Sequence, residues 1–451
     1  MKIDLLRPKV IGLPAICQSL QAHKVIRLLS RCTTKPQCAV LLLGIAMVAG
    51  CEAPPAQVAT YTQDASSGVT KLQSWYSSST GEYASPSGWW NNANSITVLA
   101  NYEKVANDNS YYSTLANTFN VTPGASGNAN FINHTRDYFD DDGWWALAWI
   151  AAYDSTGNSS YLSMAETVFS NIATNGWDTT TCGGGVWWNY SKSGKNAIPN
   201  ELFLDVAAKL ANRTTGSTSA GYLNWAKTEW PWFKAVGLIN SNNLINDGLN
   251  SSCTNNGGTE WTYNQGVILG GLVELYQADQ DPTLLPQANA IVNAVLSSSL
   301  VNSSGILVES DVSGGDHPQF KGIFLRNIMA LYRVAPSPAI QAFVENNANS
   351  ILAHDDSTGS AFGALWQGPP DSNDATRQTS ALDAIIAGIA EQGSASAGLT
   401  GAKRPGRGTD GASAFSDRSL WTEVTMSSLV ARAGTARSRA ALPRASSQIR
   451  R

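Results

Sequence analysis

The sequence predicts an all-α fold, an (α/α)6 toroid built from about six helical hairpins. Apolar side chains recur with helical spacing from about residue 65 to 392, for example over 144–150 and 267–276. Alternating strand patterns flanked by turn residues are rare in the same region. Polar turns recur at steps of 51 to 66 residues, a spacing that fits a pair of helices plus a loop.

Five turns of one kind place the predicted hairpins. In each, an apolar residue ends one helix, Gly, Asn, Asp or Pro supplies stop and cap chemistry, and another apolar residue opens the next helix. The turns cover 102–111, 153–161, 276–284 and 332–340, with a weaker version at 210–222. An open α-solenoid is the alternative, but its repeats are more uniform and its loops are shorter. Long loops rich in Trp and Gly favour a closed ring whose loops build a site.

The first 50 residues predict an export signal. Basic residues precede an apolar run over 39–50, which is too short to span a membrane comfortably and is typical of a signal peptide. The run ends in Val48-Ala49-Gly50-Cys51, which resembles a bacterial lipobox. That resemblance implies that Cys51 is lipidated and attaches the mature protein to a membrane at the cell surface. An ordinary signal peptide, which would give a secreted protein, is the alternative. The long segment before the apolar run is consistent with a start codon further downstream.

Beyond the leader, Cys182 and Cys253 are the two cysteines of the body. A lone pair in an exported protein suggests one disulfide. Metal binding is disfavoured because no CxxC motif or Cys/His cluster accompanies them, and the four histidines are scattered. We predict no metal and no cofactor.

Charge and composition divide the rest of the chain. Residues 51–64 are predicted to be a linker, 65–392 the helical domain and 393–451 a disordered basic tail; a shifted reading frame is an alternative for the tail. Residues 51–400 carry a net charge of −17 between two basic ends. An acidic body argues against nucleic acid as a partner, because phosphate binding requires clustered Lys and Arg. We expect a monomer.

The most distinctive local feature is a run of three acids, Asp140, Asp141 and Asp142, directly before an apolar helix. One Asp explains a helix N-cap. Three at one point repel each other, so the pKa of at least one is raised. Neighbouring carboxyls with different pKa values are what acid-plus-nucleophile chemistry requires. Adjacent residues at a helix start can place their carboxyl groups about 5–6 Å apart, the range of retaining glycosidases. A calcium loop is disfavoured because no acid follows at EF-hand spacing.

Three further segments combine aromatic and polar residues, at 182–203, 260–266 and 316–326. Trp and Tyr faces beside Asn, Gln and Gly suit sugars, which stack on rings and hydrogen bond through hydroxyls. Core packing is the alternative for any single Trp. The Trp pairs at 89–90, 144–145 and 187–188 cannot all point inward, so some should line a cleft.

Four segments, taken in order, resemble glycoside hydrolase family 76, the endo-α-1,6-mannanases with related fungal wall transglycosidases. They lie at 139–148, 183–202, 262–266 and 320–324. The resemblance implies an (α/α)6 fold and retaining hydrolysis of α-1,6-mannan backbones without a cofactor. Residues 65–392 would then be the catalytic domain, and α-mannan poly- or oligosaccharide its partner.

The family motif Asp-Asp-x-x-Trp-Trp falls on Asp140 and Asp141, with its tryptophans at Trp144 and Trp145. The resemblance therefore implies Asp140 as nucleophile and Asp141 as general acid/base. Asp142 leaves a second register open, although the spacing to the tryptophans favours the first. Transglycosylation by the same pair is the alternative reaction. A third possibility is a lipoprotein that binds glycans without catalysis. The predicted sugar-binding residues are Trp144, Trp187, Trp188, Asn200, Tyr263 and Asp316.

Overall fold

The computed structural model describes residues 56–126, 129–132, 138–356 and 359–399. The export signal predicted at 1–50, the lipidated Cys51 and the tail from residue 400 onward lie outside these residues. No helix in the described part of the chain has both the length and the hydropathy needed to span a bilayer.

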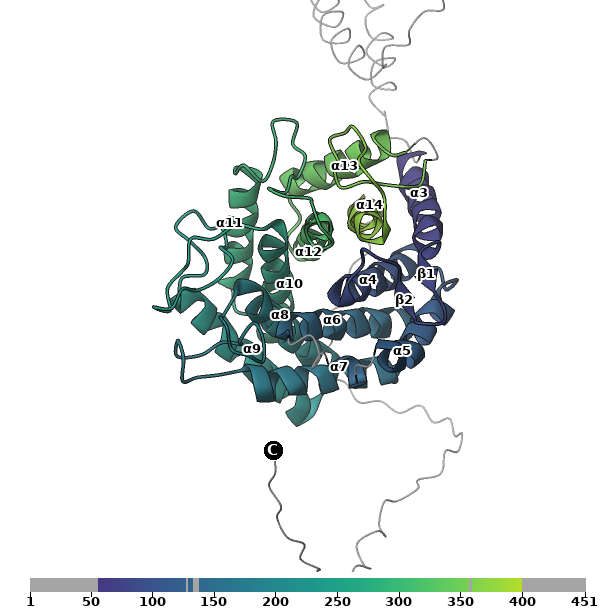
Figure 1. The fold of residues 1–451 in the computed structure, drawn as a ribbon. Coiled ribbons are helices and arrows are strands. Elements are labelled where there is room, and N and C mark those ends of the chain that lie inside the picture. The colour runs from purple at the N-terminus through teal and green to yellow at the C-terminus, as the bar shows by residue number, and fades with distance from the viewer. Residues whose placement is uncertain (1–55, 127–128, 133–137, 357–358, 400–451) are drawn as a thin grey trace, which may run out of the picture. The chain divides into compact units, whose positions relative to one another are not determined.

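Six pairs of helices form two concentric rings within the described residues (Figure 1). Each inner helix packs against the next, and the last inner helix packs against the first, which closes the ring. This confirms the predicted (α/α)6 fold. The inner helices are α4 (Trp89–Ala106), α6 (Phe139–Thr156), α8 (Ala197–Arg213), α10 (Thr262–Asp279), α12 (Phe320–Val334) and α14 (Ala375–Leu399). The outer helices are α3 (Ala56–Gln73), α5 (Tyr112–Ser126), α7 (Ser159–Asn171), α9 (Gly216–Ala235), α11 (Leu284–Leu296) and α13 (Pro338–Ala353).

All five predicted turns fall between an inner helix and the outer helix that follows it. The turn after α6 illustrates the local chemistry. Gly157 ends the helix with a φ of 72°, in the left-handed region that Gly adopts easily. Asn158 then caps α7 by accepting a hydrogen bond from the backbone N–H of Ser160 at 3.0 Å.

The sixth pair joins the two ends of the domain, where α3 packs against α14. Helix α3 begins at Ala56, so the linker predicted over 51–64 is wrong from residue 56 onward. Likewise, α14 continues past the predicted boundary at 392. Tyr61, Ala65, Val69 and Leu72 recur at helical spacing and are buried, which explains why this polar-looking segment folds against the ring.

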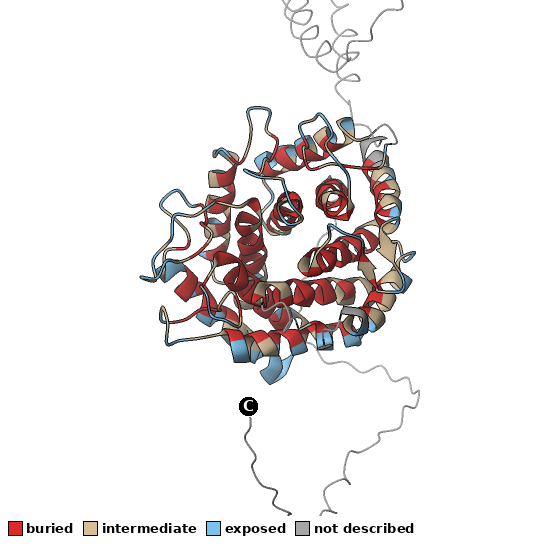
Figure 2. Ribbon diagram, viewed as in Figure 1, coloured by how far each residue is buried: buried red, intermediate tan, exposed pale blue. Residues whose placement is uncertain are grey.

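Burial concentrates on the inner ring, whereas exposed residues lie on the outer helices and loops (Figure 2). The inner helices are covered on all sides, so their apolar residues need not follow one stripe. Trp89 and Trp145 belong to this core and pack with Phe131. Their sequence neighbours Trp90 and Trp144 lie at the end of the ring where the inner helices begin. Trp89 therefore belongs to the core while Trp90 is partly exposed, whereas Trp144 and Trp145 are both buried.

Short elements fill the connections. Strands β1 (Tyr76–Ser77) and β2 (Glu82–Tyr83) form a small antiparallel hairpin in which Tyr76 is opposite Tyr83. The short helices are η1 (Ala129–Phe131), η2 (Ile172–Gly176) and η3 (His317–Gln319).

Candidate active site

Aromatic side chains from four inner helices meet at the mouth formed by the helix N-termini. The ring of Trp90 on α4 lies 5.6 Å from that of Trp144 on α6, which in turn stacks 6.4 Å from Tyr263 on α10. Tyr263 stacks on Phe320 of α12 with a centroid distance of 3.9 Å. The indole of Trp90 donates a hydrogen bond of 2.7 Å to Asp316. Segments far apart in the sequence thus build one aromatic and acidic surface.

The three consecutive acids occupy the first turn of α6 at this mouth, and their burial differs. Asp142 is fully buried, and its Oδ2 accepts a hydrogen bond of 3.1 Å from Asn171 of α7. Asp140 and Asp141 both keep exposed surface. The side chain of Asp142 is therefore engaged inside the protein, and Asp140 with Asp141 remains as the adjacent pair at the mouth.

The two carboxylate oxygens of Asp140 have different surroundings. Oδ2 accepts a hydrogen bond of 3.1 Å from the indole Nε1 of Trp188. Oδ1 has no solvent-exposed surface and no hydrogen-bond partner among the described residues. Burial raises the pKa of Asp140 to about 7. The Trp188 N–H and the backbone N–H groups of Asp140 and Asp141 oppose that rise, and the charge of Asp316 adds to it. This carboxyl is therefore easier to protonate than an ordinary aspartate.

Residues 177–196, which we call the Trp188 loop, bring the indole to Asp140. The carbonyl of Trp188 accepts a hydrogen bond of 2.9 Å from the N–H of Phe139. Asn200 holds the loop at Val186: it accepts from the Val186 N–H at 2.6 Å and donates to its carbonyl at 3.1 Å. Asn200 is fully buried. The predicted sugar contact of Asn200 is therefore wrong, because its amide is used on loop backbone.

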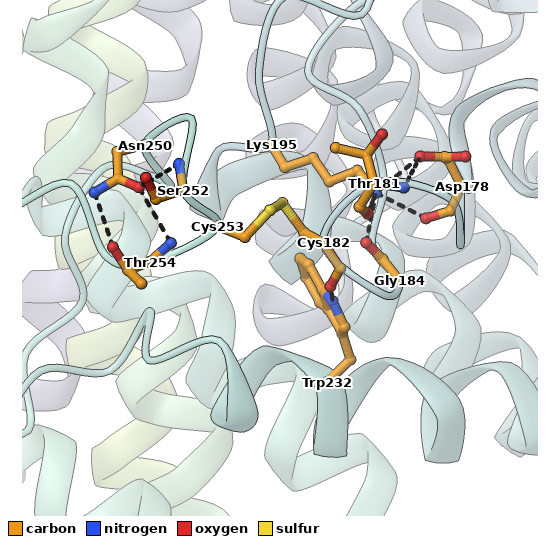
Figure 3. The surroundings of a disulfide bond; sticks show 10 residues. All are labelled: Asp178, Thr181, Cys182, Gly184, Lys195, Trp232, Asn250, Ser252, Cys253 and Thr254. Atoms are coloured by element: carbon orange, nitrogen blue, oxygen red, sulfur yellow. Dashed lines mark hydrogen bonds and ion pairs between the residues drawn. A yellow bond between two sulfur atoms is a disulfide. The ribbon is translucent and has the colours of Figure 1, made fainter.

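A disulfide between Cys182 and Cys253 joins the Trp188 loop to the segment before α10 (Figure 3). The indole of Trp232 donates to the carbonyl of Cys182 at 2.8 Å. The same ring packs on the loop backbone, so a Cβ at Gly185 would clash with it. Gly185 also has a φ of +90°, which L side chains rarely adopt. The glycine run seen in the sequence thus has a steric reason.

Lys195 cross-links the same loop through hydrogen bonds to its backbone carbonyls (Figure 3). Its ammonium group is buried and donates to the carbonyls of Asp178 and Thr181 at 2.7 Å and of Gly184 at 2.5 Å. It also lies 3.3 Å from the Asp178 carboxylate and 4.9 Å from the ring centroid of Trp187. A buried cation that donates to three carbonyls holds this part of the loop together. In the described part of the chain, no group of three or more His, Cys, Asp or Glu is placed to hold a metal.

The other predicted sugar-binding residues divide by exposure. Trp188, Tyr263 and Asp316 keep exposed surface at the mouth, and Trp187 is partly exposed beside Lys195. Trp144 is only 3% exposed. Its predicted direct contact with sugar is not supported, because it packs behind Trp90 and Tyr263.

Two aromatic residues at the mouth were not predicted individually. Trp90 is partly exposed and hydrogen bonds to Asp316. Trp261 stacks on His317 at 4.8 Å, beside Phe320. The only sequence signal was membership of a Trp pair or an aromatic cluster, which does not give the direction of a side chain.

Comparison with known proteins identifies the family. The model of glycosyl hydrolase family 76 matches residues 56–400. The chain belongs to glycosyl hydrolase family 76. It is therefore a glycoside hydrolase, and the family match coincides with the ring from α3 to α14.

Curated relatives of this family 76 chain come from fungi. A mannan endo-1,6-alpha-mannosidase of Candida albicans is 29% identical over 350 residues, which is 70% of this chain and 75% of the relative. A second one from the same organism is 27% identical over 60% of this chain and 64% of its own length. The chain thus spans about two thirds to three quarters of these relatives.

Solved structures of family 76 share the fold. An alpha-1,6-mannanase of Salegentibacter, in an inactive variant with two consecutive aspartates replaced and in complex with alpha-1,6-mannotetrose, has a TM-score of 0.65 and 21% identity. The match covers 73% of this chain and 98% of that one. The Lin0763 protein of Listeria innocua also has a TM-score of 0.65, at 23% identity over 76% of this chain and 99% of its own.

Proposed function

We propose that this family 76 protein is a retaining endo-α-1,6-mannanase that cleaves the backbone of α-mannan. The observation that carries the proposal is the adjacent pair Asp140 and Asp141 at a mouth lined with aromatic rings, with Asp142 turned inward. The mannosidase names of the curated relatives support the substrate. The inactive relative with two consecutive aspartates replaced supports the choice of an adjacent pair.

The proposed reaction has two steps. Asp140 attacks the anomeric carbon while the bond from that carbon to the leaving oxygen breaks, and Asp141 gives its proton to the leaving oxygen. Water then attacks the anomeric carbon of the glycosyl-enzyme, Asp141 takes the proton of that water, and the Asp140 carboxylate is released. Two inversions leave the α configuration unchanged. The side chains of the chain supply every proton transfer, so no cofactor enters.

The order of the two roles has opposing indications. A carboxyl with a pKa of about 7 would by itself suit the proton donor, which favours the reversed order with Asp140 as the acid. The indole of Trp188 favours Asp140 as nucleophile, because an N–H can only donate and so stabilises an ionised oxygen. The family motif also assigns the nucleophile to the first aspartate. We therefore propose Asp140 as nucleophile.

Azide rescue separates the two orders. Asp140→Ala and Asp141→Ala are each assayed on an aryl α-1,6-mannobioside whose leaving group needs no proton, with and without azide. In Asp141→Ala, azide should attack the glycosyl-enzyme and give the α-mannosyl azide. In Asp140→Ala, azide should replace the missing carboxylate and give the β-mannosyl azide. The opposite products would reverse the roles, and full activity of either variant on α-1,6-mannan would refute the pair.

We also propose that the protein is exported as a monomer and attached to a membrane through lipid on Cys51. The lipobox-like segment that ends at Cys51 supports the proposal. Labelling with a radioactive fatty acid in the native host should mark the full-length protein and not Cys51→Ala, which should appear in the medium. Equal labelling of both would refute lipidation at Cys51.

A further inference from the structure

We propose that Trp188 is a positioning residue for the carboxyl group of Asp140. Its indole N–H holds Oδ2, which fixes the rotation of the carboxyl group and favours its ionised form. The inference rests on the proposed function, because it requires Asp140 as nucleophile.

The hydrogen bonds around Asp140 restrict the rotation of its carboxyl group. A carboxylate without a directional partner can rotate and offer either oxygen. Here Trp188 Nε1 lies 3.1 Å from Oδ2, and Oδ1 has no partner among the described residues. The Trp188 ring is itself packed against Tyr138 at a centroid distance of 4.7 Å. A fixed donor on one oxygen therefore sets the rotation of the carboxyl group before substrate arrives.

The backbone around Trp188 holds the indole beside Asp140. Its carbonyl accepts from the N–H of Phe139, the residue that precedes Asp140. Its own N–H donates to the carbonyl of Gly194 at 2.8 Å. The main-chain hydrogen bond between Phe139 and Trp188 thus keeps the indole donor close to the Asp140 acceptor. On either side, Lys195 and the disulfide at Cys182 hold the Trp188 loop. The loop is already ordered, so little entropy is lost when the indole holds Asp140.

An indole N–H is suited to this role at every step of the reaction. Indole donates and does not titrate in the range of carboxyl groups, so it can donate to the Asp140 carboxyl group through the whole cycle. Before attack, it favours the ionised carboxyl, which is the reactive form. In the glycosyl-enzyme, one oxygen of Asp140 is bonded to the anomeric carbon and the other is the ester carbonyl oxygen. When water breaks that ester bond, negative charge returns to the carboxylate, and the N–H stabilises the charge as it forms.

Trp188→Phe tests the proposal because Phe keeps an aromatic ring against Tyr138 and removes the donor. We expect kcat on α-1,6-mannan to fall about 10- to 100-fold, the effect of losing one hydrogen bond to a charged group. The acidic limb of the kcat/KM profile should move to higher pH, because the ionised carboxyl loses a donor. On the activated aryl mannobioside the second step should slow, so a glycosyl-enzyme adduct should accumulate in intact-protein mass spectra.

Trp187→Phe is the matched control in the same loop. The Nε1 of Trp187 has no hydrogen-bond partner in the described structure, and its removal should leave the acidic limb in place even if KM changes. If folded Trp188→Phe kept its acidic limb of kcat/KM at the wild-type pH and accumulated no glycosyl-enzyme adduct, the inference would be overturned. An equal shift in both variants would also overturn it, since general loosening of the loop would explain it. If azide rescue instead reversed the roles of Asp140 and Asp141, the proposed function would fail at its own test.

Discussion

At the scale of single residues, three consecutive aspartates differ because one helical turn points them in different directions. Asp142 faces Asn171 in the interior, whereas Asp140 and Asp141 remain at the mouth. Like-charge repulsion was the reason to expect a raised pKa in this cluster. For Asp140 the largest cause is burial, with the charge of Asp316 a smaller addition. The sequence predicted the direction of the shift and not its main cause.

Substitution of each aspartate by Asn should separate these roles. Asp140→Asn and Asp141→Asn should fold and lose nearly all activity on α-1,6-mannan. Asp142→Asn should keep most of its kcat and lose about 1–3 kcal/mol of stability, because a buried hydrogen-bonded carboxylate is altered. Reducing-sugar release and urea unfolding measure the two effects. An inactive but stable Asp142→Asn protein would shift the catalytic register by one residue.

Residue types at the site were predictable, and side-chain directions were not. Asn200 and Trp144 have the chemistry of sugar ligands, yet they are buried by the Trp188 loop and by Trp90 with Tyr263. Trp90 has the same composition signal as Trp89 and lies at the mouth instead of the core. Which member of a Trp pair faces the cleft depends on how neighbouring helices rotate, and periodicity in one helix does not fix that.

At the scale of elements, local chemistry explains what the sequence predicted well. The five hairpin turns were found because Gly157, Asn158 and Pro338 act within a few residues of their helices. Helix α3 was placed too late because its partner α14 lies at the other end of the domain. Its apolar residues become buried only when α3 packs against α14 and the ring closes.

The disulfide should stabilise the Trp188 loop and with it the site. The double variant Cys182→Ser with Cys253→Ser avoids an unpaired thiol and should lose about 2–4 kcal/mol of stability. We expect kcat to fall as well, because Cys182 belongs to the loop that presents Trp188 to Asp140. Thermal unfolding and mannan hydrolysis at a temperature where both proteins are folded measure the effects. A stability loss with unchanged kcat would show that the loop is held without the disulfide.

At the scale of the whole domain, the two mouths of the ring have different chemistry. The mouth at the helix N-termini carries Asp140 and Asp141. At the opposite ends of the inner helices, Arg213 pairs with Asp154 at 2.7 Å and with Glu274 at 3.1 Å. Basic groups suit helix C-termini, where the dipole is negative. Burial would raise the pKa of Glu274, but Lys209 and Arg213 lower it to about 2.

Arg213→Met should therefore destabilise the domain in a pH-dependent way. Loss of one partner of a largely buried ion pair costs about 3 kcal/mol near pH 7. A depressed carboxyl pKa stabilises above the unfolded value of 4.5, and that contribution is lost as pH falls toward about 2. The gap between wild type and Arg213→Met in urea unfolding should thus narrow from pH 7 to pH 3. Lys227→Met, which breaks the more exposed pair with Asp279, should cost less than about 1 kcal/mol.

A family 76 ring with the pair Asp140 and Asp141 should hydrolyse α-1,6-mannan with retention of configuration. Digestion of unbranched α-1,6-mannan, followed by sizing and immediate NMR of the reducing ends, tests it most directly. We expect shorter oligosaccharides whose new reducing ends are first α and then equilibrate with β. Products longer than the starting mannan would indicate transglycosylation in place of hydrolysis. Ends that first appear as β, or binding without any cleavage, would contradict hydrolysis with retention.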